Sequence, residues 1–115
     1  MTTENTFTTP QEFLTQAKEL LAKAEEIREM KNADYSRGNV VDNNAAFKEM
    51  AKEVGITPLQ VWSVFAKKHF KAIDSFIKFG SESEPIEGRI IDAINYLVIL
   101  HSLIKEQEQN DSQKG

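Results

Sequence analysis

The residues best placed to do chemistry lie between Glu84 and Glu106, in the segment EPIEGRIIDAINYLVILHSLIKE. At helical spacing this segment is apolar around almost its whole circumference, which predicts a helix enclosed on nearly all sides. One narrow polar stripe interrupts it, formed by Gly88, Asp92, Asn95 and Ser102. A carboxylate and an amide on an enclosed helix need solvent, a buried partner or a ligand. Asp92 and Asn95 therefore mark a candidate site, with a thin solvent-facing strip as the plain alternative.

The chemistry expected at this stripe is oxygen ligation. Asp92 and the nearby Glu87 are predicted as metal ligands, and Asn95 as a group that holds metal or sugar. Such oxygen ligands suit Mg²⁺, which keeps several waters and commonly binds substrate phosphates. A zinc site is not expected, because the chain has no cysteine and no HxxxH or HxxE pairing.

Cationic and imidazole side chains complete the candidate ligand-binding set. Lys68, Arg89 and Arg37 are predicted to face phosphate, although an ion pair with Glu84 or Glu87 is the ordinary interpretation of Arg89. His69 lies at the centre of an apolar helix face, where it is either a neutral, hydrogen-bonded core imidazole or a ligand-contacting group. The same two interpretations hold for His101.

Motifs for catalysis are incomplete. The run Glu25–Glu29 matches EExxE, half of the metal-binding signature of all-α nucleoside-triphosphate pyrophosphohydrolases. The one ExxD of the chain, Glu108–Asp111, lies in the segment predicted to be a flexible tail and not on a core-facing helix. The glutamates of the EExxE run lie away from the apolar stripe of their helix and are interpreted as a solvated face. No P-loop and no GxSxG elbow is present. Whether the protein is an enzyme stays open.

The elements that position these residues are predicted from apolar periodicity and from three prolines. Thr9-Pro10, Thr57-Pro58 and Glu84-Pro85 each precede Glu or Gln, which is typical of a helix start. Helices are expected over residues 10–31, 44–54, 58–79 and 84–107. We therefore predict one small all-α four-helix bundle over residues 9–107, with flexible ends at 1–8 and 108–115.

The helix over residues 58–79 is rich in aromatic side chains. Its apolar arc is wider than one neighbouring helix covers, so either a second contact within the chain or a subunit interface is expected. We predict a homodimer or higher homo-oligomer through this helix.

Composition limits the classes of partner. The 115 residues carry 14 Lys plus Arg and 18 Asp plus Glu, a net charge of −4. This balance argues against bulk binding to nucleic acid or to an anionic membrane. No apolar run is long enough for a membrane span, and the N-terminus lacks a signal-peptide pattern. A cytoplasmic protein is expected.

Several segments together resemble a known group of proteins. The segments are Lys31–Tyr35, Asn44 with Phe47, Lys67-Lys68-His69, and Glu84–Leu97. This chain resembles small all-helical bacteriophage and prophage proteins related to the nucleotide modification associated domain group, with K-x-x-D-Y, N-x-x-F and D-x-x-N-Y elements. The resemblance implies a role in phage nucleotide metabolism or modification. It places Asp34, Tyr35, Lys68, Glu87, Asp92 and Asn95 around a pocket.

The sequence is compatible with three functions. The leading one is a phage-type protein that binds a nucleotide-like phosphate ligand with Mg²⁺, where Asp34 and Tyr35 close the pocket. The alternative is a non-catalytic interaction protein, such as a phage factor that blocks or sequesters a host defence protein or signal. The third is a hydrolase of nucleoside phosphates.

Overall fold

The computed structural model describes residues 6–39, 41–80 and 84–114 and contains four helices. These are α1 (Pro10–Ser36), α2 (Ala45–Val54), α3 (Pro58–Phe79) and α4 (Ile86–Lys114). The described residues include no strand. The prediction of an all-α fold with four helices is therefore confirmed.

The starts of α1 and α3 follow from their local sequence. The Thr9 and Thr57 hydroxyls accept hydrogen bonds from the backbone N–H groups of Glu12 and Gln60, whose side chains accept in return from the capping residues. Each box satisfies two backbone donors that the helix leaves free. The third proline behaves differently, because α4 begins at Ile86, one residue after Pro85.

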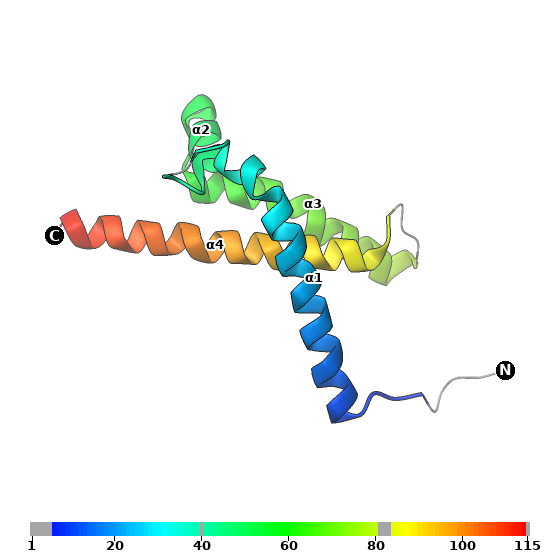
Figure 1. The fold of residues 1–115 in the computed structure, drawn as a ribbon. Coiled ribbons are helices and arrows are strands. Elements are labelled where there is room, and N and C mark those ends of the chain that lie inside the picture. The colour runs from blue at the N-terminus through cyan, green and yellow to red at the C-terminus, as the bar shows by residue number, and fades with distance from the viewer. Residues whose placement is uncertain (1–5, 40, 81–83, 115) are drawn as a thin grey trace.

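The helices are arranged around α4 (Figure 1). α3 packs along α4, α2 packs against the beginning of α3, and α1 crosses α4 and reaches α2 with its C-terminal end. The main core lies between α2, α3 and α4 and is formed by Phe47, Ala51, Val61, Ile99 and Leu103. The C-terminal end of α4 and the N-terminal half of α1 project from this body (Figure 1).

Two predicted helix ends were wrong. α1 continues past residue 31 to Ser36, so Asp34 and Tyr35 lie on its last turn and not in a loop. The packing of Tyr35 against the core explains the extension, because tertiary contact outweighs the poor helix propensity of Asn32 and Asp34. α4 continues past residue 107 to Lys114. Of the ends predicted to be flexible, residues 1–5 and 115 lie outside the described part.

α4 is not enclosed on all sides, contrary to the sequence-based expectation. Leu97 is 49% exposed and Val98 is 43% exposed, because α1 and α3 pack on the other sides of the helix. The N-terminal half of α1 is similarly open, with Phe13 62% and Leu21 57% exposed. The chain therefore leaves two apolar helix faces uncovered.

The aromatic face of α3 is used largely within the chain. It packs against both α2 and α4, and the Trp62 indole donates a hydrogen bond of 2.7 Å to the Tyr96 carbonyl. The wide apolar arc of this helix thus contacts two helices of its own chain. Of the two expectations, a second contact within the chain or a subunit interface, the structure shows the first. Assembly into a homo-oligomer stays a prediction. None of the described helices carries an apolar stretch that could cross a bilayer.

Candidate functional site

The polar stripe of α4 lies where α1 and α3 approach it. Asn95 is buried there, with 1% of its surface exposed. Its Nδ2 donates to the Ala24 carbonyl at 3.0 Å, and its Oδ1 accepts from Nη1 of Arg28 at 2.8 Å. The alternative of a solvent-facing strip is therefore wrong for Asn95. This side chain joins α1 to α4 by hydrogen bonds between residues far apart in sequence.

Asp92 lies beside Asn95 and stays partly open to solvent. Its Oδ1 accepts from Nζ of Lys31 on α1 at 3.4 Å. Its Oδ2 is 3.7 Å from Nδ1 of His69 on α3, just beyond hydrogen-bond distance. The carboxylate thus faces two helices at once, and a quarter of its side chain remains accessible.

His69 is the unusual member of the group. It is 6% exposed, and neither of its buried ring nitrogens has a hydrogen-bond partner within the described part of the chain. The ring packs on Tyr96, with centroids 4.6 Å apart. Burial lowers the pKa of His69; Asp92 opposes this shift, and the neighbouring cations Lys68 and Arg89 add to it. The ring is therefore buried and favoured in its neutral form, as one interpretation of the sequence expected. It lacks the hydrogen bond that this interpretation also expected.

Tyr35 and Asp34 lie close to this group. Burial raises the pKa of Tyr35 to about 12, with the charges of Tyr96, Asp92 and Asp34 acting in the same direction. The phenol is therefore protonated at neutral pH and available as a donor. We call the group formed by Arg28, Lys31, His69, Asp92, Asn95 and Tyr96 the His69 junction, and Tyr35 lies at its edge.

The remaining predicted residues lie at different distances from the junction. Arg89 is paired with Glu84 at 2.8 Å, which confirms the ordinary interpretation as an ion pair. Lys68 is exposed on α3 next to His69 in the chain. Arg37 instead adopts a left-handed conformation (φ 57°) at the end of α1, and its Nε lies 3.8 Å from Glu49 on α2. Arg37 is thus directed toward α2.

The two predicted metal ligands do not converge. Glu87 is paired with Lys23 at 3.2 Å, whereas Asp92 faces Lys31 and His69. Five residues of helix separate the two carboxylates, a rotation of about 140° around the axis. The described part of the chain contains no group of three or more side chains suited to hold a metal ion. The assignment of Mg²⁺ to Glu87 and Asp92 therefore stays a prediction.

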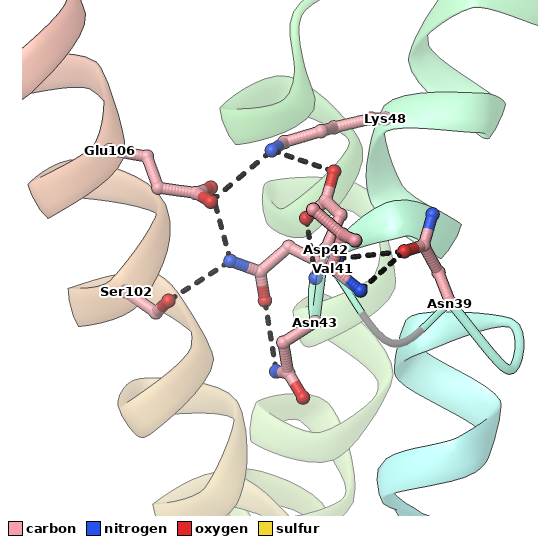
Figure 2. Close-up of polar contacts among 8 residues, drawn as sticks. Asn39, Val41, Asp42, Asn43, Lys48, Ser102 and Glu106 are labelled. Atoms are coloured by element: carbon pink, nitrogen blue, oxygen red, sulfur yellow. Dashed lines mark hydrogen bonds and ion pairs between the residues drawn. The ribbon is translucent and has the colours of Figure 1, made fainter.

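A second buried amide, Asn44, forms a network that sequence reasoning missed (Figure 2). Asn44 is 1% exposed, and its Nδ2 donates to Ser102 Oγ at 2.9 Å and to Glu106 Oε1 at 3.1 Å. Lys48 donates to Asp42 at 2.9 Å and to Glu106 at 3.2 Å. We call this group the Asn44 junction. The position of Asn44 at a helix start and of Ser102 on the polar stripe were the only signals in the sequence.

The Asn44 junction is satisfied by its own members. Burial lowers the pKa of Lys48, but its hydrogen bonds to Asp42 and Glu106 outweigh burial and leave the pKa raised. The loop before α2 is fixed as well, because Asn39 Oδ1 accepts from the backbone N–H groups of Val41 and Asp42 (Figure 2). This junction therefore fastens the start of α2 to α4.

Compared with protein-family models, with curated proteins and with solved structures, the chain matches none. The function must therefore be argued from the two junctions and the open surfaces.

Proposed function

We propose that the His69 junction binds a small phosphate-bearing ligand of the nucleotide type, as in a phage-type protein of nucleotide metabolism. The observation that carries the proposal is the pair formed by His69 and Asp92. A buried imidazole whose two nitrogens both lack partners is costly, and such groups often mark a functional site. A shift of a few tenths of an ångström would bring the imidazole within hydrogen-bond distance of the partly exposed Asp92 carboxylate.

Local charge supports an anionic ligand, although the whole chain is acidic. Arg28 and Lys31 approach the junction from α1, and the charges of Lys68 and Arg89 also reach His69. Among these, Lys31 is nearly half exposed, and its contact with Asp92 is long at 3.4 Å. Its ammonium is thus available to a phosphate without breaking a strong hydrogen bond.

Roles follow from the chemistry of each group. We assign Lys31 and Lys68 to the phosphate, with Arg89 contributing positive charge from its ion pair with Glu84. Asp92 would accept a hydrogen bond from a sugar hydroxyl, and the protonated Tyr35 phenol would donate to the ligand. Asn95 positions α1 against α4 and does not need to contact the ligand. We propose ligand binding at this junction and assign no catalytic step.

Thermal unfolding with added ligand tests the proposal. Nucleoside mono-, di- and triphosphates and inorganic phosphate are each added at millimolar concentration, with and without Mg²⁺. A ligand bound only by the folded protein raises Tm, by an amount that grows with concentration. Asp92→Asn should remove the nucleotide-induced rise. Asp74→Asn is the matched control, because Asp74 pairs with Lys78 on the exposed side of α3. No rise with any nucleotide, or an undiminished rise in Asp92→Asn, contradicts the proposal.

The alternative function is a non-catalytic interaction protein, and the open apolar faces of α1 and α4 favour it. Phe13, Leu14 and Leu21 on α1 are all more than half exposed. Such surfaces typically mark contacts with other proteins. Under this alternative, Asp92→Asn leaves function intact, whereas a charge placed at Leu21 removes it.

A further inference from the structure

The open face of α4 has the spacing of a helix-pairing seam. Ile90, Ile94, Leu97, His101 and Ile104 follow one another at intervals of four, three, four and three residues. This alternation repeats every seven residues and keeps one stripe facing a neighbouring helix. Ile90, Leu97 and Ile104 are 36%, 49% and 39% exposed, and α1 and α3 leave this side of α4 uncovered. We call these five residues the outer stripe.

The exposed surface of the chain is large enough to include a subunit interface. The chain exposes 8640 Å², whereas a compact monomer of its mass exposes about 6,400 Å². Its radius of gyration is 17.7 Å, against about 13 Å for a compact domain of this length. The projecting ends of α1 and α4 contribute to the excess, as do the open apolar side chains. The excess is similar to the roughly 1,000–2,500 Å² per subunit that obligate homodimers bury.

The outer stripe is also complementary to itself. In an antiparallel pair centred on Leu97, Ile90 lies opposite Ile104 of the second copy, and Leu97 lies opposite its own equivalent. Glu87 and Lys105 are 18 residues apart, which is five helical turns, so they share one flank of the stripe. In the antiparallel pair, Glu87 of each copy, which also pairs with Lys23 of its own chain, approaches Lys105 of the other. Lys105 makes no ion pair within the described part of its own chain.

We infer that the protein is a homodimer in which the outer stripes of two α4 helices pack antiparallel around Leu97. This interface differs from the α3 face suggested by the sequence, because that face is used to pack α2 and α4 within the chain. A two-fold axis near Leu97 makes the contact isologous, so the pairing closes at two copies.

Measurements of molecular mass, on the wild type and on variants with an introduced charge, test the interface. Sedimentation equilibrium of the full chain should give about twice the monomer mass of 13.1 kDa. Leu97→Glu should give the monomer mass with an unchanged far-ultraviolet helical spectrum. Ile77→Glu is the matched control, because Ile77 is 74% exposed on α3, and it should remain dimeric. A wild-type monomer at all concentrations up to about 1 mM overturns the inference, as does dissociation by Leu21→Glu but not by Leu97→Glu.

Cysteine cross-linking tests the orientation and does not depend on the charge variants folding. The chain has no native cysteine. Leu97→Cys should form a disulfide-linked dimer under mild oxidation. Ile90→Cys alone should not, because the two equivalent positions lie about 20 Å apart in an antiparallel pair. A mixture of Ile90→Cys and Ile104→Cys chains should cross-link. Cross-linking of Ile90→Cys alone at the rate of Leu97→Cys indicates a parallel pair and overturns the inference.

Discussion

α4 carries two buried amide junctions that differ in how completely they are satisfied. At the Asn44 junction, every polar side chain in the network meets a partner from α2, its preceding loop or α4. At the His69 junction, Asn95 is equally well bonded, but His69 beside it is not. Both amides are 1% exposed, so burial does not explain the difference.

This difference in hydrogen bonding distinguishes the Asn44 junction, which only holds helices together, from the His69 junction, which is also a candidate binding site. Asn44 and Asn95 each hold a helix against α4, and burying them without partners would be costly. Only at the His69 junction does a titratable ring remain without a partner, next to a carboxylate and an ammonium that solvent can reach. The predictions below test whether the two junctions behave as differently as their hydrogen bonds indicate.

The largest effect is expected for Asn95→Ala. The substitution leaves the Arg28 guanidinium and the Ala24 carbonyl without their buried partner. We expect the free energy of unfolding to fall by about 2–4 kcal/mol. Urea denaturation measures this loss. Asn32→Ala is the control, because Asn32 is exposed on α1 and its replacement should not lower stability.

Asn44→Ala should have the next largest effect, a loss of about 1–3 kcal/mol. Ser102 and Glu106 lose a donor, but Glu106 keeps its contact with Lys48. The two junctions are about 10 Å apart along α4, so the losses in the double variant should add to within about 0.5 kcal/mol. Strong non-additivity would show that the junctions form one unit and would remove the contrast between them.

Near pH 6.5 and just below it, the pH dependence of stability should come from the His69 junction. The folded-state pKa of His69 is lowered below the unfolded value of about 6.5, so the unfolded chain binds the proton more readily. Stability is therefore complete above pH 6.5 and decreases as pH falls below it, with a slope of at most about 1.4 kcal/mol per pH unit. His69→Leu should flatten this part of the profile.

The smallest expected effect is a difference in stability between variants of Lys31, at the His69 junction, and Lys48, at the Asn44 junction. Lys31→Gln should change the free energy of unfolding by less than about 0.5 kcal/mol, because its one ion pair is long and partly exposed. Lys48→Gln should cost about 1 kcal/mol, because Lys48 bridges two carboxylates. Equal losses in urea denaturation would mean that Lys31 is as fully engaged as Lys48 and is not available to a phosphate.

Local signals in the sequence predicted most of the fold. Thr9 and Thr57 start their helices through side chains only three residues away, so the capping boxes are visible in the sequence. The end of α1 was not predicted, since Tyr35 prolongs the helix by packing against distant core residues. The openness of α4 was also missed, because an apolar circumference does not reveal whether the neighbouring helix belongs to the same chain.

The candidate site was predicted only in part. The spacing of Asp92 and Asn95 placed them on one stripe, and the structure places His69 beside Asp92. The partners of Asn95 lie 67 and 71 residues away, so their identity depends on the crossing of α1 over α4. Arg28 was assigned no role in the sequence, because its helix face is mixed in character. The Asn44 junction was missed for the same reason, since Lys48 and Glu106 meet only in the fold.

Nuclear magnetic resonance of the histidine side chains tests the binding site most directly. The chain has two histidines, His69 at the junction and His101 on the outer stripe of α4, so ¹⁵N-labelled imidazoles report on both positions in one sample. Titration with a nucleoside triphosphate should shift the His69 ring resonances with a saturating dependence on concentration and leave those of His101 in place. Unchanged His69 resonances at millimolar nucleotide would contradict a ligand site at this junction and leave His69 as a core residue only.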